Sequence, residues 1–323
     1  MRWLAARSFA AMALTVLLGA AAITEERVVE VPGPAGPLQG TLLLAQAKAP
    51  VVVIVPGSGP TDRDGNNPLG VAASTYRLLA QALAARGINS LRIDKRGMFG
   101  SRHAIADPNK VTIGEYADDV RAWARKAGAE SGTDCAWVLG HSEGGLVALA
   151  AGDDRSICGL ILVATPGRRF GDVLREQLGS NPANAPLLEQ ALDAISALEA
   201  GGSVDAAKLD PALLPLFAPA VQGYLRDLLT YDPAKLLGGI DKPVLIVQGA
   251  RDIQVTTTDA ERLKGASARA QLVLLADVNH VLKVVATDDR AANLATYAAA
   301  ALPIAPGVVD AVGTFILQTR ASR

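Results

Sequence analysis

Short apolar runs alternate with amphipathic stretches along most of this 323-residue chain, and this alternation constrains its fold more than any other feature. The clearest run is Val51–Val55, whose five consecutive apolar residues are typical of a strand buried on both faces. Helical spacing of apolar residues appears at Tyr76–Ala85 and Ile113–Ala127. Strands separated by helices predict an α/β fold with a mostly parallel central sheet and helices on both of its faces.

The remaining expected elements continue this alternation. The strands are Val28–Val31 and Leu38–Leu44, which form an early hairpin-like pair, then Ser90–Ile93, Cys135–Leu139, Leu160–Val163, Pro243–Val247 and Gln271–Leu275. The helices are Gly144–Ala151, Thr258–Leu263 and Val308–Leu317.

The alternation stops between residues 167 and 239, where no strand pattern occurs. The amphipathic helical pieces there are Asp172–Leu178, Ala185–Leu198 and Val221–Leu229. Inserted helices that follow the carboxyl end of a strand lie over the ligand crevice of such a sheet. We therefore interpret 167–239 as a helical cap on a core formed by 23–166 and 240–323. The alternative is an ordinary helical extension packed elsewhere.

The first 22 residues are predicted to be a signal peptide. Arg2 and Arg7 precede an uncharged, mostly apolar stretch, and Ala20–Ala22 supplies the small residues that a signal peptidase recognises. The stretch is shorter than the ~20 apolar residues of a spanning helix, which argues against a membrane anchor. We expect export, to the periplasm or outside the cell, and no membrane span in the mature chain.

Two cysteines, Cys135 and Cys158, each fall at the start of an expected strand. If these strands are neighbours in register, a disulfide can form in an oxidising compartment. Two buried free thiols are the other possibility, and the sequence does not decide between them.

Composition bears on the partners of this chain. The formal net charge is −1 and aromatic residues make up only 4%, so neither a basic surface nor stacking platforms point to nucleic acid. We expect a small-molecule substrate, and the sequence makes no prediction of oligomeric state.

A sequence of the form G-x-S-x-G lies at Gly140–Gly144, between the strand that ends at Leu139 and a helix of small residues. This strand-turn-helix setting is that of a nucleophile elbow, in which a strained backbone raises a serine hydroxyl above the sheet. Flanking Cβ atoms would clash there, which explains the two glycines. Ser142 is the predicted nucleophile.

A serine hydroxyl needs a positioned base, and the chain has only three histidines. His141 is the neighbour of Ser142 and cannot easily turn back onto it, and His103 precedes the serine in a loop. His280 follows the last expected strand of the sheet, which fits the order nucleophile, acid, histidine. His280 is the predicted base.

The acid that orients His280 is expected after the preceding strand, where Asp252 lies. Asp277 is close to His280 in sequence and is the alternative. The oxyanion needs two backbone N–H groups, for which we assign Glu143 and, in the loop after Val51–Val55, Ser58. A dinucleotide-binding loop is disfavoured at this second position, because a third glycine is missing and Pro60 replaces a helix start.

With these residues assigned, nearly all of the chain after residue 28 resembles the α/β-hydrolase superfamily, and most closely its bacterial esterase, lysophospholipase and serine aminopeptidase-like branch. Besides the elbow, the resemblance rests on Asp94–Ser101, which is similar to a D-x-R-G-x-G-x-S segment with its second glycine one place late. Pro56–Pro60 stands where many relatives have His-Gly. The resemblance implies the α/β-hydrolase fold and ester hydrolysis without a metal or organic cofactor.

Three functions are consistent with these residues. The first is a carboxylesterase for small or medium acyl esters that acts through an acyl-enzyme on Ser142. It is motivated by an apolar cap that includes Leu188, Leu192, Leu213, Leu214 and Phe217. The second is a serine exopeptidase or amidase, in which Glu143, Asp62 or Asp64 would hold a charged terminus. The third is a binding protein on an enzyme scaffold, which the complete set of candidate residues disfavours.

Overall fold

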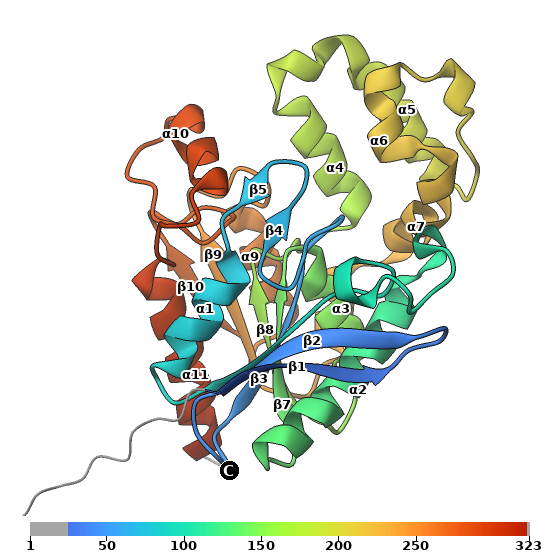
Figure 1. Ribbon diagram of the computed structural model, residues 1–323. Coiled ribbons are helices and arrows are strands. Elements are labelled where there is room, and N and C mark those ends of the chain that lie inside the picture. The colour runs from blue at the N-terminus through green and yellow to red at the C-terminus, as the bar shows by residue number, and fades with distance from the viewer. Residues whose placement is uncertain (1–24, 322–323) are drawn as a thin grey trace, which may run out of the picture.

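The core is a mostly parallel sheet of eight strands, seen in a computed structural model that describes residues 25–321 (Figure 1). Its strands lie in the order β1-β2-β6-β3-β7-β8-β9-β10, and only β1–β2 and β2–β6 pair antiparallel. The strands are β1 (Glu25–Pro32), β2 (Pro37–Leu44), β3 (Val51–Val55), β6 (Asn89–Ile93), β7 (Ala136–His141), β8 (Ile157–Val163), β9 (Val244–Gly249) and β10 (Gln271–Leu275). A separate two-stranded ribbon is formed by β4 (Asn66–Asn67) and β5 (Val71–Ala72).

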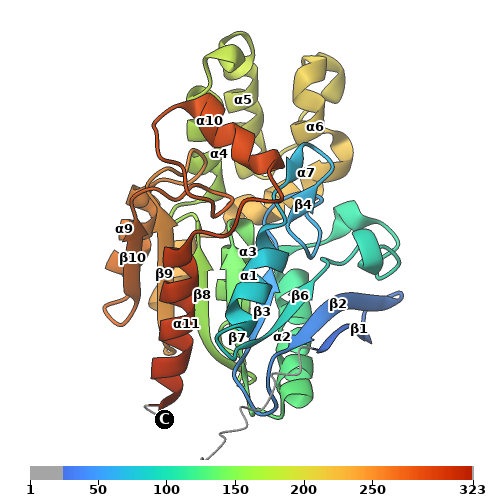
Figure 2. The ribbon, with the colours of Figure 1, turned by 60° about the vertical axis from the view of Figure 1, so that its left-hand side comes forward.

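Helices cover both faces of the sheet (Figure 2). The helices are α1 (Thr75–Ala84), α2 (Ile113–Ser131), α3 (Glu143–Ala151), α4 (Phe170–Gly179), α5 (Leu188–Glu199), α6 (Leu214–Phe217), α7 (Pro219–Thr230), α8 (Pro233–Gly238), α9 (Thr257–Ala266), α10 (Arg290–Ala295) and α11 (Pro306–Ala321). Apolar side chains of α1 and α11 form one core cluster with the sheet, while those of α2, α3 and α9 form another on the opposite face.

The predicted fold class is confirmed, and the reason is visible in single elements. Every residue of β3 is buried, because helices cover both sides of this central strand. α2 begins where Thr112 and Glu115 form a reciprocal capping box, and it ends at Gly132 in the left-handed region. β7 runs two residues past its predicted end, to His141, so the strand leads directly into Ser142.

Between β8 and β9 the chain forms α4 to α8 and short 3₁₀ turns, and residues 167–239 contain no strand. α4, α5, α6 and α7 rise together beyond the end of the sheet at which β7 meets α3 (Figure 1). Ile195 of α5 and Phe217 of α6 are fully buried in an apolar cluster that continues into the α2–α3 side of the core. α5 starts three residues later than predicted because Pro186 keeps the preceding turn in 3₁₀ geometry.

The cysteines form a disulfide. Cys135 immediately precedes β7 and Cys158 lies in β8, and their Cα atoms are 5.3 Å apart. The two strands are parallel neighbours, so the condition set by the sequence for a disulfide is met.

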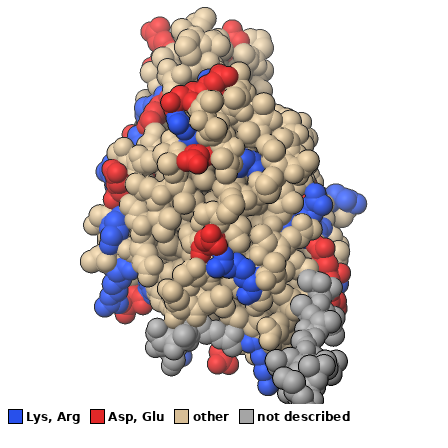
Figure 3. Space-filling model, turned by 90° about the vertical axis from the view of Figure 1, so that its left-hand side faces the viewer, with Lys and Arg blue, Asp and Glu red and all other residues tan. Residues whose placement is uncertain are grey.

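On the face that contains α1 and α11, acidic and basic side chains are interspersed, so no large patch of one charge forms there (Figure 3). Within residues 25–321, no helix combines the length and the apolar character needed to cross a membrane. The predicted signal peptide lies outside the described residues.

Candidate active site

Ser142 lies at the sharp turn from β7 into α3, with φ 55° and ψ −123°. A positive φ is unusual for serine, and such strain marks a position held by its surroundings. The surroundings leave no room for side chains on either side. A Cβ at Gly140 would lie 2.1 Å from the carbonyl oxygen of Gly144, and one at Gly144 would lie 2.4 Å from that of Val55. These are the close approaches that the G-x-S-x-G pattern predicted.

The structure brings His280 and Asp252 together. His280 Nδ1 donates to Asp252 Oδ2 over 2.8 Å, and both side chains are almost completely buried. The second carboxylate oxygen accepts the backbone N–H groups of Gln254 and Val255 at 2.8 and 3.0 Å. Asp277, the alternative acid, is exposed and forms no side-chain bond with His280 among the described residues. The carboxylate therefore fixes the ring so that Nε2 is the nitrogen left for chemistry.

A buried amide network holds the loop that carries His280. The Asn279 side chain donates to Asn293 Oδ1 and Thr296 Oγ1, at 3.0 and 2.7 Å, and accepts the Lys283 N–H. Asn293 in turn donates to the backbone carbonyl of Arg251, the residue before Asp252, at 2.7 Å. α10 thus joins the loop of His280 to the loop of Asp252, a contact that the sequence did not indicate.

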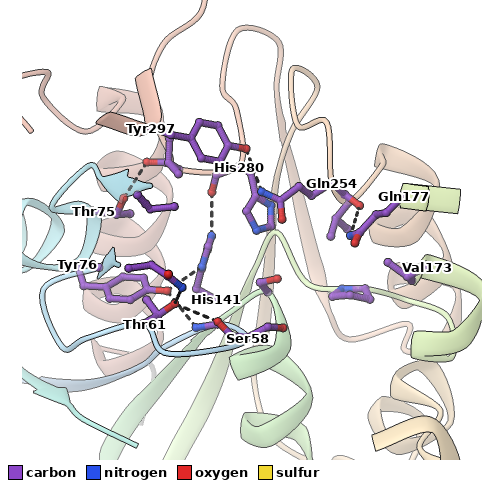
Figure 4. A pocket seen from close by; sticks show the side chains of 18 of the residues that line it. Ser58, Thr61, Thr75, Tyr76, His141, Val173, Gln177, Gln254, His280 and Tyr297 are labelled. Atoms are coloured by element: carbon purple, nitrogen blue, oxygen red, sulfur yellow. Dashed lines mark hydrogen bonds between the residues drawn. The ribbon is translucent and has the colours of Figure 1, made fainter. Parts of the chain in front are cut away.

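His141 is fixed by bonds at both ring nitrogens (Figure 4). Nε2 lies 2.8 Å from the carbonyl oxygen of His280, which can only accept, so Nε2 carries the proton. Nδ1 then accepts from the Tyr76 hydroxyl at 2.9 Å, and that hydroxyl accepts the Gly57 N–H at 3.0 Å. Burial, and secondarily the nearby His280 ring, lowers the pKa of His141 to about 3, so the ring stays neutral.

The two assigned oxyanion donors flank the serine. Glu143 is the first residue of α3, and its N–H has no acceptor among the hydrogen bonds of residues 25–321. The Ser58 N–H is equally unbonded there, and Ser58 lines the cavity above Ser142. The Gly57 N–H is already donated to the Tyr76 hydroxyl, so it is not available as a donor to an oxyanion.

Ser142 and His280 open onto one cavity of about 250 Å³. No hydrogen bond joins Ser142 Oγ to the His280 ring in the described part of the chain, so this link of the predicted triad is not formed here. Apolar side chains of α4 line one wall, namely Phe170, Val173 and Leu174, while polar groups of Thr61, Asn67, Gln254 and Tyr297 line the others (Figure 4). Such an arrangement can enclose a small, largely apolar molecule with one polar group.

A family model described as "Alpha/beta hydrolase family" matches residues 52–297, about three quarters of the chain. The chain belongs to the alpha/beta hydrolase family. Esterase EstD of Thermotoga maritima is 29% identical to it over 267 residues, which are 80% of this chain and 60% of EstD. The chain therefore spans only about 60% of the length of that relative.

Solved structures of similar fold include two esterases. Est1E from Butyrivibrio proteoclasticus has a TM-score of 0.56 at 18% identity, over 91% of this chain and 99% of Est1E. The Pyrococcus furiosus esterase Pf2001 has a TM-score of 0.55 at 18% identity, over 91% of this chain and 93% of that one. At this identity they establish the alpha/beta hydrolase fold.

In the D-x-R-G-like segment that suggested this family, Asp94 supports the loop that carries Arg63, whereas Arg96 is bonded to α2. Asp94 accepts the Arg63 and Gly100 N–H groups and pairs with the Arg63 guanidinium at 2.8 Å. Arg96 forms two bonds with Asp119 of α2, at 2.6 and 2.8 Å. Lys95 between them is buried and contacts both Gly57 and Glu143. The sequence motif located this segment without indicating what Lys95 contacts.

Proposed function

We propose that this protein is an exported serine hydrolase that cleaves carboxylic esters through an acyl-enzyme on Ser142. The observation that carries the proposal is the convergence of a strained serine and an aspartate-bound histidine on one cavity. Esterase relatives support the ester bond as the target. Helices α4 to α8 are proposed as the cap, because α4 supplies the apolar wall of the cavity.

The proposed mechanism assigns one role to each of these side chains. The Ser142 oxygen attacks the acyl carbon while His280 Nε2 takes its proton, and Asp252 stabilises the imidazolium. The carbonyl oxygen becomes an oxyanion that accepts the N–H groups of Ser58 and Glu143. His280 then protonates the departing alcohol. Water, deprotonated by His280, attacks the acyl group, and the acid leaves as Ser142 regains its proton.

Ester cleavage is favoured over exopeptidase activity because the acidic side chains near the site are already bonded to other groups of the protein. Glu143 is buried and paired with Lys95, so it does not face the cavity as a free carboxylate. Asp62 accepts N–H groups of its own loop from Asp64 and Asn66, and Asp64 pairs with Arg92. These carboxylates are bound within the protein, which weakens the case for a site that holds a charged amino terminus.

The size of the cavity supports a short acyl group. About 250 Å³ lies just below the range of roughly 300–1,000 Å³ that is typical of small-molecule sites. We expect acetate and butyrate esters of p-nitrophenol to be cleaved faster than octanoate or longer esters, and faster than amino-acid anilides.

Covalent labelling tests the nucleophile directly. A fluorophosphonate probe is expected to label the wild-type protein at Ser142 and to leave Ser142→Ala unlabelled, with ester turnover lost together with labelling. Ser180→Ala is the matched control, since Ser180 is exposed on the helical segment, and it should keep both. A Ser142→Ala variant that still turns over esters would contradict the proposal.

The proposed export has independent support from chemistry. A disulfide such as Cys135–Cys158 persists in an oxidising compartment and is uncommon in a reducing one. Expression of the full chain in a bacterial host, followed by fractionation and amino-terminal sequencing, should give a periplasmic or secreted form that starts at Ile23. Retention of an uncut chain in the cytoplasm would count against export.

A further inference from the structure

Lys95 has almost no exposure to solvent, yet it contacts both segments that carry the N–H groups assigned to the oxyanion. Its ammonium donates to the Gly57 carbonyl oxygen over 2.7 Å and pairs with Glu143 Oε1 at 3.2 Å. The side chains of Lys95 and Glu143 are 3% and 1% exposed. A buried ion pair is weak evidence of stabilisation, because desolvation of the charges offsets their attraction, so another role for this pair has to be considered.

The Gly57 carbonyl and the Ser58 N–H belong to the same peptide unit. A trans peptide is planar, so its carbonyl and its N–H point in opposite directions, and the described chain has no cis peptide. A bond that holds the Gly57 carbonyl toward the interior therefore turns the Ser58 N–H away from Lys95. Ser58 lines the cavity beside Ser142, which is the side on which an oxyanion would form.

The preceding peptide unit is fixed as well. The Gly57 N–H donates to the Tyr76 hydroxyl, which is held by His141. Gly57 also lies against the elbow, since a Cβ there would be 3.3 Å from the Ser142 Cβ. With its N–H and its carbonyl both bonded, Gly57 cannot rotate without breaking a buried hydrogen bond, and an unmade buried bond is costly.

The same ammonium also contacts the side chain of the residue that carries the other assigned donor. Its second partner, Glu143, is the residue whose own N–H is the other assigned donor. Lys95 thereby ties the Gly57–Ser58 loop to the first turn of α3. A cation bonded to the carbonyl of a peptide also polarises that peptide, which strengthens its N–H as a donor.

We propose that Lys95 is a positioning residue for the oxyanion: its ammonium, anchored by Glu143, orients and polarises the Gly57–Ser58 peptide so that the Ser58 N–H stabilises the tetrahedral intermediate. This rests on the proposed function, since it needs Ser142 to form such an intermediate. The role concerns the transition state and not the bound ester, because the oxyanion exists only after attack.

The test is a variant that removes the hydrogen bond and keeps the net charge of the site. Lys95→Met combined with Glu143→Gln replaces a buried ion pair by neutral side chains of similar size. We expect kcat for p-nitrophenyl butyrate to fall roughly 10- to 100-fold, somewhat less than the loss of an entire oxyanion donor. KM should change less than threefold.

A second readout separates positioning from general destabilisation. A trifluoromethyl ketone, which forms a tetrahedral adduct with an active-site serine, should lose affinity by the same factor as kcat, while the matching methyl ketone should bind as before. The matched control is Arg96→Met with Asp119→Asn, which removes a neighbouring buried ion pair that does not touch the Gly57 loop. It should lower stability with kcat changed less than threefold.

The possible outcomes decide different questions. If the Lys95 and Glu143 double variant folds and keeps kcat within threefold, or loses kcat and methyl ketone binding alike, the proposal is wrong. If it does not fold, a crystal structure of the wild-type trifluoromethyl ketone adduct decides, and a Gly57 carbonyl turned away from Lys95 overturns the proposal. Absence of fluorophosphonate labelling at wild-type Ser142 would instead remove the proposed function itself.

Discussion

The floor and the roof of the cavity are built in different ways. The floor comprises the elbow, the Gly57–Ser58 loop and the loops of Asp252 and His280, and buried hydrogen bonds hold all of them. The apolar wall formed by Phe170, Val173 and Leu174 of α4 is called the roof below. It contacts the floor through a hydrogen bond from the Gln177 side chain to the Gln254 carbonyl.

This difference suggests that the floor determines the rate of the reaction and the roof determines which acyl groups bind. Directional bonds fix atoms to fractions of an ångström, which stabilisation of a transition state requires. Apolar contacts are non-directional and respond mainly to volume, which suits discrimination between acyl groups. Changes in the floor should therefore alter kcat or the pH dependence of stability, and changes in the roof should alter substrate preference or KM.

The largest effect is expected in the floor at Asp252. Asp252→Asn keeps the size of the side chain but removes the acceptor that holds His280 in its active tautomer, so kcat for p-nitrophenyl butyrate should fall about 10⁴-fold with little change in KM. Steady-state kinetics on the purified variant measures it. Asp277→Asn is the matched control, since Asp277 is exposed, and should stay within twofold of wild type. A greater loss at Asp277 would reassign the acid.

The second effect is a dependence of stability on pH that comes from His141. Its native pKa of about 3 lies below the ordinary 6.5, so between these two pH values the unfolded chain binds a proton at this ring and the native protein does not. Stability from this group is complete above pH 6.5 and is lost as pH falls toward 3, with a slope of about 1.4 kcal/mol per pH unit and a total on the order of 4–5 kcal/mol.

His141→Asn tests that assignment, because its amide oxygen can still accept from the Tyr76 hydroxyl but does not titrate, while loss of the bond to the His280 carbonyl lowers stability equally at each pH. The free energy of unfolding is measured by urea titration at several pH values between 4 and 7. Its change with pH should be smaller in the variant than in the wild type, by the equivalent of about one bound proton. A roof variant such as Leu178→Ala should lower stability equally at each pH. Equal slopes in wild type and His141→Asn would show that His141 is not the buried neutral group described above.

The sequence predicted the parts of the molecule that depend on local patterns. β3 and β10 have the predicted bounds, because each is a short and mostly apolar run of five residues. The elbow was predicted because Ser142 sits between a strand and a helix whose residues are adjacent in sequence. Asp252 was predicted from chain order, a rule of the fold rather than of local chemistry.

What the sequence did not predict depends on contacts between distant segments. Tyr76 and His141 are 65 residues apart, and Lys95 and Glu143 are 48 apart, so no periodicity or spacing links them. The ribbon of β4 and β5 has only two residues in each strand and leaves no alternating pattern. α10 has six residues, too few for an amphipathic pattern to stand out.

A smaller effect is expected in the roof at Leu174, which lines the cavity from α4. Leu174→Ala enlarges the acyl site, so the ratio of kcat/KM for octanoate to that for butyrate should rise roughly tenfold, with kcat for butyrate changed little. Leu178→Ala is the matched control, one helical turn further along and outside the cavity. If both variants shift the ratio equally, α4 acts through stability and does not select the acyl group.

The smallest effect is expected where the roof meets the floor. Gln177 donates to the Gln254 carbonyl over 2.9 Å, and Gln254 follows Asp252 by two residues. A single hydrogen bond contributes about 1 kcal/mol, so Gln177→Ala should raise KM roughly two- to threefold through a looser roof and leave kcat unchanged. Gln190→Ala, which removes a similar side-chain bond to the Lys208 carbonyl within the helical segment, should leave both constants unchanged. A fall in kcat for Gln177→Ala would mean that the roof helps to hold the acid loop, and the division between floor and roof would have to be redrawn at Gln254.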